Sequence, residues 1–99
     1  MRKQIIKSVM DLLMLAELRN GTMSGYDAIG FIHNKFGVLV SSGTVYSHLY
    51  SLERDGLVTG TWEVKKRVYA ITEKGEQALE NVAKANKELI DTLKSILDY

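Results

Sequence analysis

The first part of the chain has apolar residues around most of the circumference of a helix. No glycine or proline interrupts residues 2–19, so the pattern predicts one helix over this range. Its apolar positions are Ile5, Ile6, Val9, Met10, Leu12, Leu13, Met14, Leu15 and Leu18. A helix that is apolar on nearly all sides is buried on more than one side, so we expect this helix to lie at the centre of the fold.

A second helix is predicted after the segment NGTMSGYD, residues 20–27. The segment has the Asn and Gly residues of a helix end, and Ser24 followed three residues later by Asp27 resembles a capping box. The helix should run to about Phe36. Its inward-facing positions are Ile29, Ile32 and Phe36.

A third helix is predicted from the segment SSGTVYSHLYSLERDG, residues 41–56. Either Ser41 or Ser42 can accept hydrogen bonds from the free backbone amides at its start, and Gly56 ends it. Its core face is formed at i, i+4 and i+7 by Val45, Leu49 and Leu52.

Two short runs rich in β-forming residues follow in LVTGTWEVKKRVYAIT, residues 57–72. They surround the polar segment 63–66 and predict a β-hairpin with a charged tip. From Thr72 to Leu97 the chain has no breaker after Gly75, so one helix of roughly 25 residues is predicted, longer than the average of about 11 to 12.

The last helix has an apolar seam with 3-4-3-4-3 spacing, typical of a coiled coil. The seam consists of Leu79, Val82, Asn86, Leu89, Leu93 and Ile96, widened by Ala83, Ile90 and Leu97. Asn86 falls where a buried amide can fix the register of a dimer, or it points to solvent beside the seam. The seam could pack on the first helix of the same chain, but the all-round apolar first helix favours a homodimer.

Composition narrows the class of protein. The chain has 99 residues, which suits one domain, and it has no cysteine, which excludes disulfides, thiolate zinc sites and thiol catalysis. No apolar run approaches the ~18 residues of a membrane span and no signal peptide is recognisable, so we expect no membrane partner and a cytoplasmic location. Residues 1–71 hold nine Lys/Arg against six Asp/Glu, and residues 72–99 hold four against six, a split too small to establish nucleic-acid binding by itself.

Candidate chemistry does not indicate an enzyme. His33 and His48 lie on different predicted helices, and no third histidine or cysteine exists to complete a zinc site, although carboxylates could in principle contribute. Neither a Ser/His/Asp arrangement nor a pair of catalytic carboxylates is visible, and GTMSG, residues 21–25, follows a helix rather than a strand, unlike a phosphate-binding loop. We therefore predict no catalysis, no metal and no cofactor.

Three helices followed by a hairpin are typical of a winged helix-turn-helix, a mainly α (α+β) fold, here with a long C-terminal helix. The segments LMLAELRNGTMSGYDAI, VSSGTVYSHLYSLERDGLV and RVYAITEKGEQAL keep the order and spacing of the PadR family of transcriptional regulators, which the chain resembles over almost its whole length. The resemblance implies a DNA-binding domain over residues 1–71, a dimerisation helix over 72–99, and a homodimer on operator DNA. The third helix would enter the major groove and the hairpin would lie against the backbone.

The surface expected to contact DNA combines the start of the third helix with the hairpin tip. Hydroxyls and Gly43 let backbone amides approach phosphate at the positive end of a helix, and tyrosine hydroxyls can donate to phosphate. The expected contacts are Tyr26, Ser41, Ser42, Gly43, Thr44, Tyr46, Ser47, Tyr50, Lys65, Lys66 and Arg67. Alternatively, the tyrosines pack against the hairpin or a neighbouring helix, and the hairpin cations are only solvated.

Two features shape the expected mode of action. No Lys or Arg lies between Ser41 and Glu53, so readout should depend on Thr44, Ser47, His48, DNA shape and the hairpin.

The expected dimer interface consists of Ile6, Met10, Leu13, Leu79, Val82, Asn86, Leu89, Leu93 and Ile96. The leading hypothesis is thus a regulator, more often a repressor in this family, that binds double-stranded palindromic DNA. The resemblance also raises a small hydrophobic or aromatic effector near the dimer interface. Trp62 and the Met10 and Met14 side of the first helix are possible linings, but core packing explains these residues more simply. The alternative is a winged-helix module that binds another protein.

Overall fold

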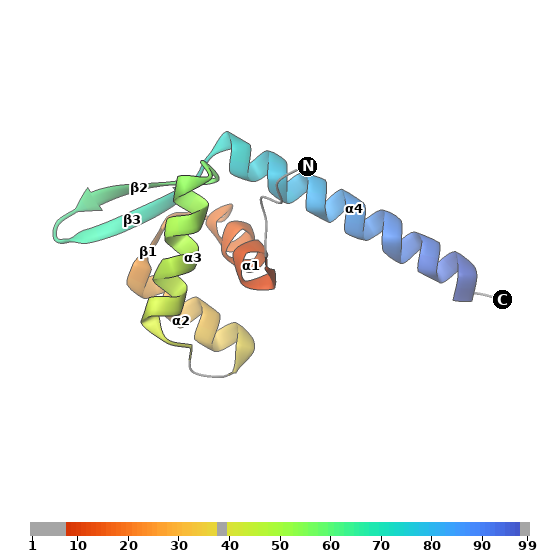
Figure 1. Ribbon diagram of the computed structural model, residues 1–99, viewed down its shortest axis with the longest axis horizontal. Coiled ribbons are helices and arrows are strands. Elements are labelled where there is room, and N and C mark those ends of the chain that lie inside the picture. Colours follow the sequence, from red (N-terminus) through yellow and green to blue (C-terminus); the bar gives the residue numbers. More distant parts are fainter. Residues whose placement is uncertain (1–7, 38–39, 98–99) are drawn as a thin grey trace.

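The computed structural model describes residues 8–37 and 40–97, and only the backbone of Phe36. Two positions singled out from the sequence, Ile6 and the inward side chain of Phe36, therefore lie outside the described residues. Figure 1 shows three short helices gathered beside a hairpin and one long helix that extends away from them. The elements are α1 (Val9–Leu18), β1 (Met23–Ser24), α2 (Gly25–Phe36), α3 (Ser42–Arg54), β2 (Val58–Glu63), β3 (Lys66–Ile71) and α4 (Glu73–Leu97). The predicted winged helix-turn-helix with a long C-terminal helix is confirmed.

Serines begin each of the three short helices. The Ser24 side chain accepts from the Asp27 backbone and the Asp27 carboxylate accepts from the Ser24 backbone, so the predicted capping box is confirmed. Ser41 rather than Ser42 caps α3 and accepts from Thr44 N at 3.2 Å. Ser8 caps α1 in an extended conformation, so the prediction of one uninterrupted helix from residue 2 to residue 19 is wrong.

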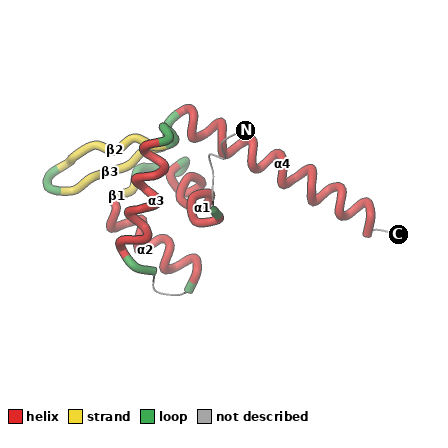
Figure 2. Tube along the Cα trace, viewed as in Figure 1, coloured by secondary structure: helices red, strands yellow, loops and turns green. Residues whose placement is uncertain are grey.

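The sheet has three antiparallel strands in the order β1-β3-β2. Strand β1 pairs Met23 with Tyr69 and was missed in the sequence, because two residues give no alternating pattern. Strands β2 and β3 form the predicted hairpin, here called the wing, and Figure 2 shows it projecting from the helices. Val64 and Lys65 form its tight two-residue turn with positive φ values of 37° and 67°, the backbone that favours Gly or Asn.

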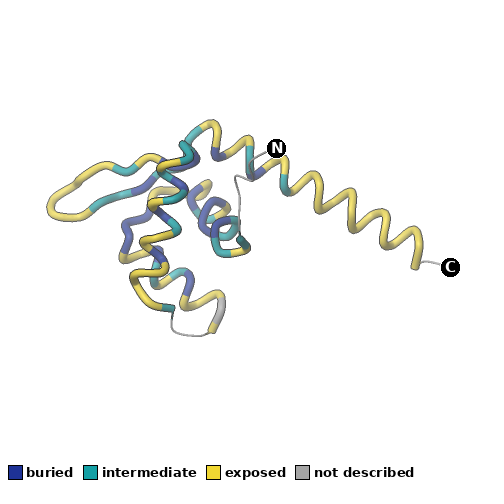
Figure 3. The backbone as a smooth tube through the Cα atoms, in the orientation of Figure 1, coloured by how far each residue is buried: buried dark blue, intermediate teal, exposed yellow. Residues whose placement is uncertain are grey.

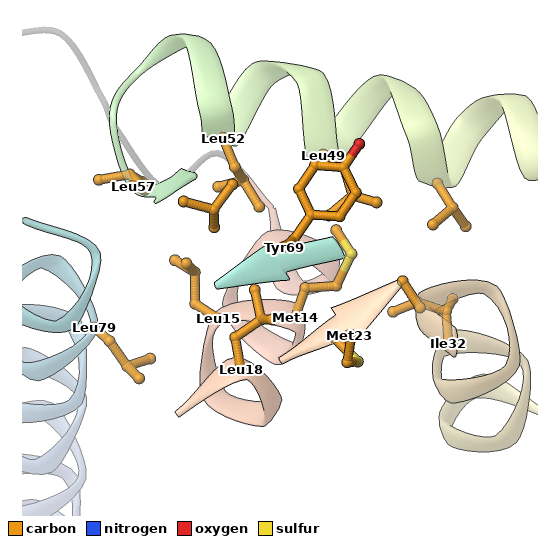
Figure 4. Close-up of a cluster of buried hydrophobic side chains, with 13 residues drawn as sticks. Met14, Leu15, Leu18, Met23, Ile32, Leu49, Leu52, Leu57, Tyr69 and Leu79 are labelled. Carbon is orange, nitrogen blue, oxygen red and sulfur yellow. The ribbon is translucent and has the colours of Figure 1, made fainter. Parts of the chain in front are cut away.

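The core packs on one face of α1, formed by Asp11, Met14, Leu15 and Leu18, whereas Val9 is 63% exposed, so α1 is less enclosed than its apolar circumference predicts. Met14 and Leu15 are fully buried, and the predicted face of α3, Val45, Leu49 and Leu52, packs in the same cluster. Figure 4 shows the Tyr69 ring from β3 among these side chains beneath α3. The remaining buried apolar members are Leu18, Met23, Ala28, Ile32, Leu57, Val58 and Leu79. Each large aliphatic side chain buried here contributes roughly 1.5–3 kcal/mol to folding.

Helix α4 has two parts with different surroundings. At its base, Gly75 and Leu79 are buried against the winged helix, and α4 packs on α1. From residue 83 to residue 97 every residue is exposed, as the continuous exposed tube in Figure 3 shows. We call residues 83–97 the arm. The arm gives the molecule its longest dimension of 57 Å.

Membrane-spanning helices and metal-binding clusters are both absent from the residues that the structure describes. Over residues 8–37 and 40–97, no helix is both long and apolar enough to cross a membrane. Within the same ranges, no group of three or more His, Asp or Glu side chains is arranged to hold a metal ion.

Candidate nucleic-acid interface

The outer face of α3 is an exposed polar surface beside the wing. Its inner positions fill the core, so the next stripe is left uncovered, and Tyr46 and Tyr50 are 38% and 67% exposed. The start of the helix and Ser47 share this surface. The predicted contacts on it, all exposed, are Ser41, Ser42, Gly43, Thr44, Tyr46, Ser47 and Tyr50.

The first turn of α3 is open to an approaching anion. The Ser41 and Thr44 hydroxyls lie 2.8 Å apart and form a hydrogen bond with each other, so part of their hydrogen-bonding capacity is already used at the helix cap. Gly43 has no other atom near the position its Cβ would take. The positive end of the helix dipole and the exposed hydroxyls therefore face solvent together, as phosphate binding requires.

An open groove of about 570 Å³ separates α3 from the wing. Its floor and walls come from the start of α2, the outer face of α3 and both wing strands, which are far apart in sequence. Lining side chains are mostly aromatic or cationic. They come from Ser24, Gly25, Tyr26, Tyr46, Tyr50, Trp62, Lys65, Lys66, Arg67 and Tyr69. Ser24, Gly25 and Tyr69 were not among the expected DNA contacts, because only the fold brings them beside α3.

The Tyr46 ring packs on the start of α2 while part of it stays exposed. A Cβ at Gly25 would lie 2.8 Å from Tyr46 Cζ, so glycine is needed for this close approach. Much of the Tyr46 ring is therefore packed against the neighbouring helix α2, which was one of the two interpretations offered from the sequence. The exposed remainder still borders the groove, as does Tyr26, which is 81% exposed in the first turn of α2.

Arg67 is not at the hairpin tip, and the expectation of three adjacent cations there is wrong. It lies in β3, paired across the wing with Trp62. Its Nη2 atom donates to Glu53 Oε2 at 2.6 Å, and its guanidinium stands 5.6 Å from the Trp62 ring centre and 5.9 Å from that of Tyr69. The hydrogen bond to Glu53 raises the pKa of Arg67, and burial raises the pKa of the Tyr69 hydroxyl. Arg67 therefore fastens the wing to the end of α3.

Lys65 and Lys66 are the exposed cations of the wing tip. Neither makes an ion pair with a carboxylate in the described part of the chain. The pKa of Asp27 is lowered mainly by its hydrogen bonds with Ser24, and the charge of Lys66 lowers it further. Both lysines line the groove from the wing side, so the wing tip adds positive charge to it.

His48 faces inward rather than toward the groove. Its Nδ1 atom lies 2.7 Å from Oδ1 of Asp11, whose side chain is only 3% exposed. His48 was expected to take part in DNA readout, and the structure corrects this because its ring joins α3 to α1. The two residues are 37 positions apart, so no local pattern could have indicated the pair.

The predicted dimer residues divide between core and surface. Leu79 is 7% exposed and belongs to the core of its own chain, and Met10 packs against that core. Leu13 and Val82 are partly buried, and Asn86 is exposed. The arm residues Leu89, Leu93 and Ile96 are 57%, 46% and 71% exposed, so they remain free for a partner.

Comparison with known proteins identifies relatives of the whole arrangement. The family model described as "Transcriptional regulator PadR-like family" matches residues 13–81. The transcriptional activator GvpE of Haloferax mediterranei is 34% identical over 79 residues, which are 80% of this chain and 40% of the length of GvpE.

Two solved structures show the same architecture. A PadR-like transcriptional regulator from Bacillus cereus has a TM-score of 0.77 at 24% identity, covering 98% of this chain and 99% of that one. Bacillus subtilis PadR in complex with operator DNA has a TM-score of 0.66 at 25% identity, covering 77% of this chain and 47% of that one. Because the family model spans the winged helix from α1 to the base of α4, this chain belongs to the PadR-like family of transcriptional regulators.

Proposed function

We propose that this regulator binds double-stranded DNA with α3 in the major groove and the wing against the backbone. The observation that carries the proposal is the exposed polar face of α3 beside the wing-tip lysines Lys65 and Lys66. A helix of this size fits the major groove, and unpaired cations on a hairpin suit phosphate or the minor groove. The solved complex of Bacillus subtilis PadR with operator DNA supports the same use of this fold.

Sequence preference has to come from small side chains. No Lys or Arg lies between Ser41 and Glu53, so the bidentate guanine contact is unavailable on this face. Thr44 and Ser47 can reach base edges, and Tyr46 and Tyr50 can donate to phosphates. Part of the specificity then comes from the shape and deformability of the DNA.

The proposed active form is a homodimer joined through the arm. Leu89, Leu93 and Ile96 repeat on one side of the arm and are exposed in the single chain. Two copies related by a twofold axis would present two α3 helices to a palindromic operator. Half-sites about 34 Å apart, one helical turn of DNA, are expected.

The proposed effect on transcription is repression by occupation of promoter DNA, without catalysis. GvpE, which is described as an activator, shows that a relative of this chain acts in the opposite direction. A reporter gene behind the bound promoter tests the direction, since repression requires a rise in reporter output when the regulator is deleted. A fall in output would make this chain an activator and overturn the repressor proposal.

Fluorescence anisotropy tests DNA binding directly. A labelled duplex from upstream of the gene for this chain is titrated at several salt concentrations beside a scrambled duplex. Specific binding to the upstream duplex should weaken steeply with salt, because phosphate contacts release counterions. The double variant Lys65→Ala/Lys66→Ala should weaken binding to both duplexes and reduce the salt slope by about 2, one unit for each phosphate that is no longer neutralised.

A matched variant controls for net charge. Lys84→Ala/Lys94→Ala removes two exposed lysines from α4, away from the groove, and should leave the slope close to that of the parent chain. No binding at low salt would contradict the proposal and favour the protein-interaction alternative, which the lack of cations on α3 supports. In that case a protein partner should bind with little dependence on salt.

A further inference from the structure

The groove between α3 and the wing offers aromatic ring faces that a DNA duplex cannot use. It presents five aromatic side chains beside the two wing-tip lysines. The rings belong to Tyr26, Tyr46, Tyr50, Trp62 and Tyr69. Bases in a duplex stack on one another, so only an unpaired base has a free face to stack on an aromatic side chain. We propose that the groove is also a binding site for unpaired nucleotides of single-stranded DNA.

Exposed rings on three different elements supply the stacking surface. Tyr26 in α2, Tyr50 in α3 and Trp62 in β2 are 81%, 67% and 72% exposed. Aromatic surface gathered in one exposed groove marks a binding site rather than a core. Because every base has a π face, stacking on such rings tolerates any sequence. The groove should therefore bind unpaired strands without a strong sequence preference.

The Trp62 ring is held in place before any strand binds. Arg67, its partner across the wing, stands 5.6 Å from the ring centre and donates to Glu53 Oε2 at 2.6 Å. The ring is thus connected through Arg67 to the end of α3. A base that stacks on a ring already fixed in this way immobilises few further side chains, which lowers the cost of binding.

The charges in the groove suit a polynucleotide backbone. Lys65 and Lys66 line it without an ion pair among the described residues. Arg67 is already paired with Glu53, so the two lysines are the lining cations left for phosphates. Phosphates of a bound strand would lie toward the wing tip, and its bases would lie toward Trp62 and Tyr50.

The position of the groove leaves room for a chain of nucleotides. Its volume of about 570 Å³ is that of a site for a few stacked groups, and because it is open a strand can continue beyond it. Figure 1 shows the wing and the arm extending in opposite directions. A dimer joined through the arm would therefore leave the groove uncovered.

A bound strand would compete with the proposed duplex for one surface. It would cover Tyr46, Tyr50 and the two lysines, which are the proposed phosphate contacts in duplex binding. This consequence rests on the proposed function, whereas binding of the strand itself does not. An excess of unpaired strand should therefore release the chain from its duplex site.

The single tryptophan makes the test specific to the groove. Because Trp62 is the only tryptophan, one indole N–H signal in a two-dimensional ¹⁵N–¹H NMR spectrum reports this site alone. The whole chain is titrated without duplex, first with hexathymidylate and then with a hexamer of abasic sites, which has the same phosphates but no bases. We expect hexathymidylate to shift the Trp62 indole signal and the Lys65 and Lys66 amides, and to bind at least tenfold more tightly than the abasic hexamer.

Two changes at Tyr50 separate stacking from hydrogen bonding. Tyr50→Leu removes the ring and should weaken hexathymidylate at least fivefold, because stacking of one base is lost. Tyr50→Phe keeps the ring and should restore most of the affinity for the strand, although it lacks the hydroxyl proposed to donate to duplex phosphate. Tyr50 is exposed, so both variants should fold, and Trp62 remains in both as the reporter.

Salt dependence tests the part played by the lysines. Two phosphates neutralised on a single strand predict a slope of about −1.4 for log affinity against log salt concentration. Lys65→Gln/Lys66→Gln should bring this slope close to zero. The control Lys84→Gln/Lys94→Gln, on the exposed side of α4 away from the groove, should leave the slope unchanged.

Several outcomes would overturn the proposal. These are equal binding of hexathymidylate and the abasic hexamer, shifts confined to the arm residues Ile90, Leu93 and Leu97, or no shift at all. Tighter binding of hexauridylate than of hexathymidylate would assign the groove to RNA instead. Since these titrations contain no duplex, failure to bind operator DNA leaves their result readable, and failure to bind the strand leaves the duplex proposal standing.

Discussion

The base and the arm of α4 share one helix and one apolar seam but have opposite surroundings. Leu79 in the base is 7% exposed, and Leu93 in the arm, two heptads further along the chain, is 46% exposed. At the base the seam packs on α1 and Leu79 belongs to the core, so its apolar residues stabilise the fold. In the arm the same kind of residue has no cover in the single chain. An apolar seam in a sequence therefore indicates that its residues are buried. Only the fold shows whether residues of the same chain bury them.

The largest effect is expected at the base, from Gly75→Ala. A Cβ at position 75 would collide with the carbonyl oxygen of Leu57 and lie 2.8 Å from Cγ1 of Ile71. Because backbone atoms cannot move aside as a side chain can, the free energy of unfolding should fall by about 3 kcal/mol. Urea denaturation followed by circular dichroism measures the loss.

Gly30→Ala is the matched control. Gly30 is also inside a helix, but no atom lies within 4 Å of the position its Cβ would take. Alanine there should stabilise the chain by up to about 1 kcal/mol, because it has the higher helix propensity. If Gly75→Ala proved as harmless as Gly30→Ala, the base of α4 would not be packed as described.

In the arm, Leu93→Asp should leave the winged helix folded and disrupt association. A carboxylate in the seam of the proposed homodimer is strongly unfavourable, so the dissociation constant of that dimer should rise at least about 100-fold, or about 2.7 kcal/mol. Sedimentation equilibrium measures the constant. Ser95→Asp adds the same charge on the other side of the arm and should change it little. Equal dissociation constants for the two variants would exclude this seam as the dimer interface.

The sequence predicted the fold better than it predicted the site. Periodicity located α3, because Val45, Leu49 and Leu52 repeat on its buried face, and the two runs rich in β-forming residues located the wing. It could not predict β1, which is too short to alternate, or the pairing of Asp11 with His48, which depends on how α1 crosses α3. It also placed Arg67 with the free lysines, because successive residues of a strand point to opposite faces and only the register shows which neighbours each one meets. The groove itself exists only when α2, α3 and the wing are brought together.

A smaller effect in the arm should come from Asn86→Val. Asn86 occupies an a-type position of the seam, where an amide between paired helices lowers stability. Replacing it should tighten the dimer by about tenfold, or about 1.4 kcal/mol, measured again by sedimentation. No change would place Asn86 beside the seam, in contact with solvent in the dimer as well.

The smallest effect returns to the base, at the residue where α4 begins. The Thr72 hydroxyl donates to the Gly56 carbonyl at 2.6 Å and accepts from Gly75 N at 3.0 Å, so it ties the end of the α3 turn to the first turn of α4. Thr72→Ala removes both bonds and should lower the free energy of unfolding by about 1 kcal/mol. Urea denaturation detects this loss, and Thr72→Ser, which keeps the hydroxyl, should restore most of it. Because the cap fixes how α4 leaves the winged helix, Thr72→Ala should leave the arm seam itself intact. A change in the dimer dissociation constant as large as that of Leu93→Asp would therefore show that base and arm do not act independently.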